Sequence, residues 1–393
     1  MTPLALLLGL LPLLCLAQSP SGAVPAAGTT SSKLTIGTWF WYTEHTPASW
    51  NSLMDHNYGS FQTETSVPYS LTADGTDIVN EHPSGQQEVN FMRDPLRWDD
   101  GTNASIFLTV YAHYLLKNGT GGLDLVTDEG LTALANRLNY YHKETGRDVF
   151  VRWCPEMNGE WFLYGPPTSP AYYVSVWKKM ATIIKKIAPN TKLVWSPNFD
   201  LKPGNRGYWP GAEYVDIVGT SVYWKGNGRD DSIPLSYAAD SISTIYNEYA
   251  APNNLPFFIT EASGAWELNV PTSIDQATFQ SQFWGGILNT DFLNRFPLVQ
   301  AAYIFDFLKQ EEFLRDFRVS NDTAVRNAFN QLLAPLTSQG VIQWATSAAP
   351  VKVSALPSNT HIQVATTAAA SSKSGAVGIT AGLVGWGLAC LLL

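Results

Sequence analysis

The chain has 393 residues, and its formal net charge is −9. The chain is acidic and has no stripe of basic residues, so nucleic acid is not an expected partner. The three cysteines are Cys15, Cys154 and Cys390. The first and last lie in the two terminal apolar runs, so Cys154 is alone between them. No intrachain disulfide is expected there, and the domain must rely on a large apolar core.

The N-terminal residues 1–17 contain the apolar run LALLLGLLPLLCLA, which ends at Ala17. Its length and the small residue at its end predict a cleaved signal peptide and hence a secreted protein. The alternative, a signal anchor, requires a run longer than this one for a bilayer span. Residues 18–32 are rich in Ser, Pro, Gly, Ala and Thr and are typical of a linker.

Eight apolar segments between residues 33 and 307 predict strands. Their near-continuous β-branched and aromatic residues are typical of strands buried on both faces of a parallel sheet. The segments are 33–42, 61–67, 104–113, 149–153, 192–196, 215–224, 256–261 and 298–307, of which 61–67 is the weakest.

Amphipathic segments alternate with these strands and predict helices over 128–145, 170–188, 274–289 and 322–333. Eight strands alternating with helices over residues 33–344 predict an α/β fold, a single-domain (β/α)8 TIM barrel. A doubly wound open sheet is the alternative. The first strand is not followed by a glycine-rich phosphate loop, which disfavours nucleotide binding.

The C-terminal part changes composition twice. Residues 345–374 are rich in Ser, Thr and Ala and predict a stalk, and residues 375–393 form a second apolar tail. No basic residue follows the tail, and small residues precede it. This pattern predicts a GPI-attachment signal, with a retained tail helix as the alternative. The expected location is extracellular, attached to the cell surface by that lipid anchor alone, and the expected state is a monomer.

Three sequons fit an extracellular surface: Asn103-Ala-Ser, Asn118-Gly-Thr and Asn321-Asp-Thr. We expect Asn103, Asn118 and Asn321 as candidate N-glycosylation sites. The histidines lack the spacing of metal ligands and no HExxH motif is present, so neither a metal nor another cofactor is expected.

Two glutamates follow predicted strands at the positions where a barrel displays catalytic groups. Glu156 comes after the fourth strand, and Glu261 ends the seventh. Their strand ends face one another across the barrel mouth. A pair of carboxylates there can act as acid/base and nucleophile on a glycosidic bond, provided that they lie about 5–5.5 Å apart. A salt bridge or a cap is the structural alternative for each glutamate.

The residues around Glu156 and three further segments resemble glycoside hydrolase family 26. The segment Arg152-Trp-Cys-Pro-Glu-Met-Asn-Gly-Glu-Trp161 is similar to the family pattern R-x-x-H-E-x-x-G-x-W. The segments from Val194 to Asn198 and from Tyr208 to Gly219 look like the family's fifth strand and its approach to the sixth. Ser221-Val-Tyr223 follows. At this position the wider group of barrel hydrolases has a tyrosine that forms a hydrogen bond with the nucleophile.

The resemblance implies a role for individual residues. It implies that Glu156 is the acid/base, Glu261 the nucleophile and Tyr223 the residue that orients Glu261. It also implies that Trp161 is a sugar-binding platform and Arg152 an orienting charge.

The sequence suggests further substrate-binding residues near strand ends. His113 ends the third strand and is a candidate sugar ligand, with a buried structural histidine as the alternative. Since sugars stack on aromatic rings, we expect about half of the tryptophans near strand ends to line the site. These are Trp39, Trp41, Trp195, Trp224 and Trp266, of which Trp195 and Trp266 are the candidate site residues.

Two departures from the family pattern bear on the substrate. Pro155 stands where the family has a histidine, and proline has no N–H to donate. Phe305 or Phe307 stands where the family has a tryptophan near the end of the eighth strand. A catalytic role for Cys154 is a further alternative, disfavoured because its motif supplies no paired histidine.

The sequence therefore predicts a retaining hydrolase that cleaves internal bonds of a β-linked polysaccharide, with β-1,4-mannan favoured by the family resemblance. Mixed-linkage glucan and xylan remain open as substrates. A transglycosylase that remodels a cell wall and a cell-surface glycan-binding protein without activity are the functional alternatives. Pro155 motivates the last of these, and the presence of both glutamates argues against it.

Overall fold

The computed structural model describes residues 33–67, 95–113, 115, 119–166, 168–199 and 203–349. The predicted signal peptide, the linker and the apolar tail lie outside these residues, as does most of the stalk. Asn118 also lies outside them. All the described residues belong to one compact unit.

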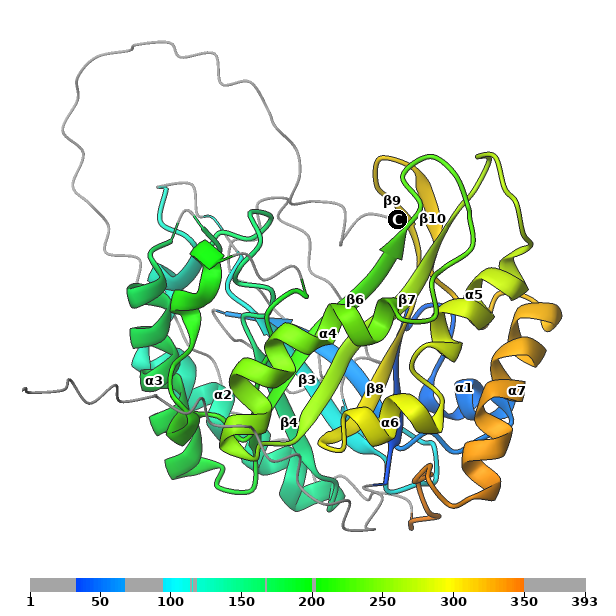
Figure 1. Ribbon diagram of the computed structural model, residues 1–393. Helices are drawn as coiled ribbons and strands as arrows, with labels where there is room; N and C mark the ends of the chain where they lie inside the picture. The colour runs from blue at the N-terminus through cyan, green and yellow to red at the C-terminus, as the bar shows by residue number, and fades with distance from the viewer. Residues whose placement is uncertain are drawn as a thin grey trace, which may run out of the picture. The chain divides into compact units, whose positions relative to one another are not determined.

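Eight parallel strands close into a barrel, which confirms the predicted (β/α)8 fold (Figure 1). Closure rests on the pairing of β1 with β8, from Thr35 opposite Ala301 to Phe40 opposite Asp306. The alternative of an open doubly wound sheet is therefore wrong. The strands are β1 (Thr35–Phe40), β2 (Ser60–Ser66), β3 (Ser105–Tyr111), β4 (Val149–Trp153), β5 (Lys192–Trp195), β6 (Ile217–Lys225), β7 (Phe257–Glu267) and β8 (Val299–Asp306).

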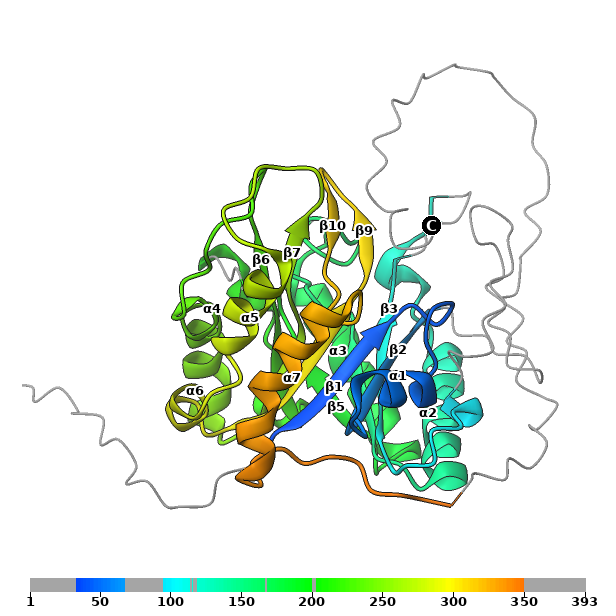
Figure 2. The same ribbon diagram turned by 90° about the vertical axis from the view of Figure 1, so that its right-hand side faces the viewer.

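Helices cover the outside of the barrel (Figures 1 and 2). They are α1 (Pro47–Met54), α2 (Asp128–Thr145), α3 (Pro170–Ile187), α4 (Tyr237–Ile245), α5 (Gln276–Gly285), α6 (Thr290–Arg295) and α7 (Thr323–Ser338). Short helical turns lie at η2 (Pro95–Arg97), η3 (Gly122–Leu125), η4 (Pro203–Tyr208), η5 (Ala212–Tyr214), η6 (Tyr246–Ala250) and η7 (Ala251–Asn253). The four predicted helices correspond to α2, α3, α5 and α7.

Local sequence fixes where the helices begin and end. The side chain of Thr127 caps α2, and Ser169 caps α3 and is followed by Pro170. Both residues offer a hydroxyl oxygen to an N–H group that the helix leaves unpaired. Gly146 ends α2 with a φ of 66°, a conformation that glycine adopts without strain.

The hydrophobic core lies in two layers. A large cluster fills the space between strands and helices, where Trp50, Trp177 and Trp284 are fully buried. A smaller cluster fills the barrel interior and includes Phe107, Phe258 and Tyr303. Because apolar side chains occupy the interior, the barrel is a packed scaffold whose functional groups belong at the strand ends.

Two short strands extend the sheet past the barrel. These are β9 (Leu308–Gln310) and β10 (Leu314–Asp316), and β10 pairs antiparallel with the end of β7. In Figure 1 they rise beyond the carboxyl end of β7. Arg315 of β10 is buried and donates two hydrogen bonds to Glu267 of β7, which fixes this extension on the barrel.

The segment after α7 returns to the amino-terminal ends of the strands. The backbone N–H of Ala345 donates to Asn57 at 2.8 Å, and that of Ala348 donates to Gly101 at 2.9 Å. Residues 345–348, which composition assigns to the stalk, are therefore part of the folded domain. Composition alone misses this because Ala345 and Ala348 bind through their backbone N–H groups, which every such residue carries.

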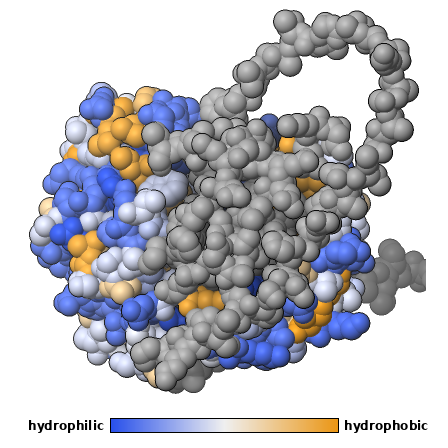
Figure 3. Space-filling view, turned by 180° about the vertical axis from the view of Figure 1, so that it is seen from behind, coloured by the Kyte–Doolittle hydropathy of each residue, from blue (hydrophilic) through white to orange (hydrophobic). Residues whose placement is uncertain are grey.

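One face of the described part of the chain is mainly hydrophilic. In Figure 3, the described residues of this face are hydrophilic over most of its area, with small separate hydrophobic areas. Among the described residues, no helix is long and apolar enough to cross a membrane.

Candidate active site

Glu261 lies on β7 and is held by two strong donors. Only 7% of the residue is exposed. Its carboxylate accepts hydrogen bonds from Nη1 of Arg152 and from the hydroxyl of Tyr223. A cation and a phenol bonded to one carboxylate form charge-assisted hydrogen bonds that fix its rotamer.

Arg152 of β4 links three neighbouring strands inside the barrel mouth. It is fully buried, so its charge is not solvated by bulk water. Besides Glu261, it donates to Ser221 Oγ at 2.7 Å and to Ser196 Oγ at 3.1 Å. A buried guanidinium with these partners orients Glu261 and compensates its charge.

A bulge in β7 brings Glu261 to the inside of the barrel. The register of β7 shifts against β6 between Thr220 and Ser221, and against β8 between Ile259 and Ala262. As a result, Thr260 and Glu261 are adjacent in sequence yet both contact interior groups: the Thr260 hydroxyl lies 2.7 Å from Ser196 Oγ. Bulges of this kind redirect side chains beside active sites.

Glu156 lies in a strained turn just after β4. Its φ is 54° and that of Cys154 is 38°, values that cost non-glycine residues about 1–3 kcal/mol each. Hydrogen bonds to both neighbouring strands hold the turn: the N–H of Cys154 donates to Val110 at 2.8 Å, and the N–H of Glu156 donates to Ser196 at 2.8 Å. Pro155 between them has a restricted φ, which limits the turn further.

The carboxylate of Glu156 accepts two hydrogen bonds from neutral donors. Asn198 Nδ2 lies 3.1 Å from Oε1, and the indole Nε1 of Trp161 lies 3.0 Å from Oε2. Asn158 holds Asn198 in place through a reciprocal pair, in which it accepts from the Asn198 N–H at 2.7 Å and donates to the Asn198 carbonyl at 3.0 Å. Glu156 is thus oriented without a cationic partner among these contacts.

Tyr223 is positioned by an aromatic cage. Its ring meets Phe305 edge-on at 5.4 Å and Phe317 at 5.6 Å, and its carbonyl accepts a hydrogen bond from the Tyr237 hydroxyl at 2.6 Å. These contacts direct the phenol hydroxyl at Glu261. From there the hydroxyl can stabilise negative charge on the Glu261 carboxylate.

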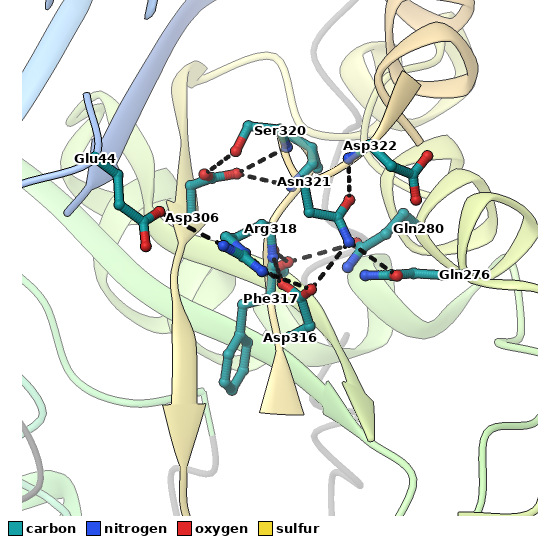
Figure 4. A network of polar contacts seen from close by, with 12 residues as sticks. Glu44, Gln276, Gln280, Asp306, Asp316, Phe317, Arg318, Ser320, Asn321 and Asp322 are labelled. Carbon is teal, nitrogen blue, oxygen red and sulfur yellow. Dashed lines mark hydrogen bonds and ion pairs between the residues drawn. The ribbon is translucent and has the colours of Figure 1, made fainter. Parts of the chain in front are cut away.

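The turn that carries Phe317 is tied to Asp306 at the end of β8 (Figure 4). The Asp306 carboxylate accepts from Val319 N at 2.7 Å, from Ser320 N at 3.2 Å and from Ser320 Oγ at 2.6 Å. Burial raises the pKa of Asp306 to about 7. In Figure 4 the Phe317 ring points away from this polar network, whereas its backbone belongs to it.

Comparison with known proteins agrees with this geometry. Residues 102–264 match the sequence profile described as glycosyl hydrolase family 26. This segment contains Glu156, Glu261 and all three polar partners of Arg152. Residues 102–264, which carry both glutamates, are thus similar to glycosyl hydrolase family 26.

Characterised relatives match only part of the chain. A mannan endo-1,4-beta-mannosidase A and B from Caldalkalibacillus mannanilyticus is 33% identical over 109 residues, which are 26% of this chain and 20% of that protein. The match thus spans about a fifth of that relative's length.

Solved structures of the family share the fold. The catalytic domain of an endo-beta-1,4-mannanase from a Bacillus species has a TM-score of 0.54 at 15% identity and covers 77% of this chain and 86% of its own. A modular endo-beta-1,4-mannanase from Cellulomonas fimi has a TM-score of 0.52 at 16% identity, with 82% and 76% covered. The GH26C protein of a Muricauda species has a TM-score of 0.53 at 13% identity, with 77% and 86% covered.

The two departures from the family 26 pattern have clear positions in the structure. Pro155 is buried inside the strained turn of Glu156. Phe305 contacts Tyr223, whereas Phe307 packs edge-on against Trp41 at 4.9 Å. Of the two phenylalanines, Phe305 is therefore the one beside the residue that orients Glu261.

His113 follows β3 and is half-buried. Its ring meets Tyr111 edge-on at 5.3 Å. This places it at the same end of the barrel as both glutamates. Its role as a sugar ligand stays a prediction.

Two predicted sugar-binding tryptophans point away from the site. Trp195 is only 1% exposed and packs against Trp209 and Tyr249 on the helix side of β5, so its assignment to substrate is wrong. Strand alternation explains the error: Val194 faces the barrel interior, and its neighbour must face outward. Trp266 is partly buried and packs edge-on against Phe279 of α5 at 5.3 Å, also away from Glu261.

Sequence reasoning missed the polar residues that hold the two glutamates. Asn198, Asn158, Ser196 and Ser221 were not among the predicted site residues, although each contacts Glu156, Arg152 or a direct partner of these. A signal existed for all four, because each lies in a segment that carries the family resemblance: Asn158 in Arg152–Trp161, Ser196 and Asn198 in Val194–Asn198, and Ser221 in Ser221–Tyr223.

Cys154 has a structural role in the turn. It is fully buried, and burial raises the pKa of its thiol well above the usual value. A thiol in that state is a poor nucleophile. Within the described part of the chain, no group of three or more His, Cys, Asp or Glu side chains is arranged to hold a metal ion.

Proposed function

We propose that this protein is a retaining glycoside hydrolase that cleaves internal bonds of a β-1,4-mannan. The observation that supports this most is the unequal pair of glutamates at one end of the barrel. Glu261 is bonded to Arg152 and Tyr223, as suits a nucleophile, and Glu156 is bonded to neutral donors, as suits a group that exchanges protons. The names of the matching relatives favour mannan as the substrate.

The reaction proceeds by two displacements. Glu261 attacks the anomeric carbon while Glu156 donates its proton to the glycosidic oxygen, so that the carbon–oxygen bond breaks and the leaving chain departs as an alcohol. Glu156, now a carboxylate, takes a proton from water, whose oxygen attacks the same carbon. The bond to Glu261 breaks, and the sugar is released with its original configuration.

Reducing-sugar release from mannan, mixed-linkage glucan and xylan tests this proposal. We expect the largest release from mannan. Glu156→Gln and Glu261→Gln should each lower turnover by about a thousandfold or more, and Glu160→Gln serves as the matched control because Glu160 is an exposed neighbour in the same loop. Near-normal rates in either glutamine variant would contradict the assignment.

The alternatives differ in their products. Binding to a polymer without new reducing ends favours a glycan-binding protein, and Pro155 is the feature that motivates this reading. Chains that lengthen as well as shorten favour a transglycosylase. Sizing the products of a defined oligosaccharide distinguishes all three.

We further propose an extracellular monomer that is attached to the cell surface by a GPI anchor, on the basis of the terminal sequences. Release of the protein from membranes by a phosphatidylinositol-specific phospholipase tests the anchor. Among the sequons, Asn103 is exposed and suits glycosylation. Asn321 is half-buried, and its Nδ2, the attachment atom, donates to Gln276 at 3.0 Å and to Asp316 at 2.9 Å. Peptide mass spectrometry should find glycan on Asn103 and none on Asn321.

A further inference from the structure

The described residues include five large exposed apolar side chains, Leu115, Trp161, Leu163, Tyr172 and Leu235, of which the first four lie on one side of the barrel mouth. The first four come from the loops after β3 and β4 and from the first turn of α3. Leu235 comes from the segment between β6 and α4. Because loops that follow strands lie at the carboxyl end of a barrel, the first four share the end that carries both glutamates.

Three of these residues contact one short segment, residues 121–124. Leu115 forms a β-bridge with Gly121. A Cβ atom on Gly122 would lie 3.2 Å from Cβ of Leu163, so the two loops touch there. The Tyr172 hydroxyl donates to Asp124 Oδ1 at 2.8 Å, which fixes a ring that is 41% exposed. The loops after β3 and β4 therefore form one continuous surface with the start of α3.

Trp161 connects this surface to Glu156. Its ring lies against the backbone of Gly159, where an added Cβ would come within 2.2 Å of it. Its indole N–H donates to the Glu156 carboxylate at 3.0 Å, yet 49% of the residue is exposed. The ring thus reaches from the Glu156 carboxylate to the protein surface, in the same loop as Leu163.

The position of the proton donor indicates which part of the substrate this surface would contact. The acid of a retaining glycosidase donates to the oxygen of the leaving group, while the nucleophile approaches from the opposite face of the sugar. Here Glu156 and the apolar surface lie on the β3–β4 side, and Glu261 lies on β7. The leaving part of the chain must therefore emerge on the side of the exposed apolar residues. The C–H faces of pyranose rings are apolar and pack on such side chains.

We propose that Leu115, Leu163 and Tyr172, continuous with Trp161, form a binding surface for the leaving-group portion of a polysaccharide chain. The proposal rests on the assignment of Glu156 as the proton donor. It predicts that affinity depends on sugar units beyond the bond that is cleaved, on the reducing-end side of that bond.

Kinetics on two substrates test the surface. Leu163→Ser and Tyr172→Ala are compared with Leu235→Ser, whose leucine is 69% exposed but lies elsewhere. On a polymeric mannan, each of the first two variants should lower kcat/KM by about tenfold, which corresponds to about 1.4 kcal/mol. On an aryl β-mannobioside, whose leaving group is a single phenol, they should match the wild type. Leu235→Ser should match the wild type on both substrates.

Equal losses on the two substrates, or no loss on mannan, would overturn the proposal. Electrophoresis in gels that contain mannan measures binding without catalysis. Mannan should retard the wild type and Leu235→Ser more than Leu163→Ser or Tyr172→Ala. If mannan retards the proteins in this pattern but the wild type does not cleave it, the binding surface is supported and the proposed activity is wrong. A wild type that mannan does not retard overturns the surface.

Discussion

The two glutamates occupy opposite kinds of surroundings. Glu261 lies within a strand, is 7% exposed and contacts a buried cation. Glu156 lies in a turn just past its strand, is half-buried, has a φ of 54° and accepts from an amide and an indole. The buried cation compensates the charge of Glu261, whereas the contacts of Glu156 come from neutral donors. The difference supports the proposed roles, with Glu261 as the nucleophile and Glu156 as the acid/base.

Azide distinguishes the two roles by stereochemistry, and this is the largest expected effect. Glu156→Ala and Glu261→Ala should each lose about a thousandfold or more in turnover of an aryl β-glycoside. Azide should rescue both variants. It should give the β-glycosyl azide with Glu156→Ala, because the covalent step on Glu261 persists. It should give the α-glycosyl azide with Glu261→Ala, where azide replaces the nucleophile. NMR of the products identifies each anomer, and the reverse assignment would exchange the two roles.

Removing the Arg152 cation should lower the free energy of unfolding mainly through its effect on Glu261. Arg152→Met leaves a buried carboxylate without its charge partner, which should lower the free energy of unfolding by about 3–5 kcal/mol. Adding Glu261→Gln to Arg152→Met should recover much of this loss, because no buried charge remains. Urea unfolding measures both values. If Glu261→Gln lowers stability further in the Arg152→Met background, the ion pair is not the reason for the loss.

The aromatic cage around Tyr223 should act through its hydroxyl. Tyr223→Phe should lower kcat by about tenfold or more, since it removes one hydrogen bond to a charged group. Phe317→Leu should lower kcat by less, and it should have little further effect in the Tyr223→Phe background. Phe329→Leu, which removes a ring buried against Trp284, is the control for a general loss of packing. Additive effects of the two changes would show that Phe317 does not act through the phenol.

A third carboxylate, Asp306, should have the smallest effect on activity and a distinct effect on stability. Its pKa is about 7 in the folded protein, above the ordinary value of 3.8, so the folded state binds the extra proton between these values. Its contribution to stability is therefore greatest at low pH and is lost as the pH rises from about 4 to about 7. The carboxylate also faces Asp316 and Arg318, both of which belong to the same network.

Asp306→Asn isolates this contribution because an amide keeps the size and an acceptor oxygen. Between pH 4 and pH 7, the melting temperature of the variant should fall less than that of the wild type. Calorimetry at several pH values measures the difference. Parallel curves for the two proteins would show that Asp306 does not titrate in this range.

The sequence predicts the fold and the two candidate catalytic glutamates because both depend on patterns along one strand. Buried strands show as apolar runs, and a glutamate at a run's end is at the barrel mouth. Trp195 was misplaced because an aromatic residue near a strand end fits either face until the register is known. The bulge at Glu261 and the hydrogen bond from Asn198 to Glu156 depend on pairing between strands, which no single segment encodes.

Trapping of the glycosyl–enzyme intermediate tests the central claim most directly. A 2-deoxy-2-fluoro-β-mannosyl fluoride should form the ester quickly and release it slowly, since the fluorine destabilises both transition states. Mass spectrometry of the digested protein should find the sugar on Glu261, and Glu261→Gln should remain unlabelled. A label on Glu156, or an active enzyme that inverts configuration and never carries a label, would contradict the account.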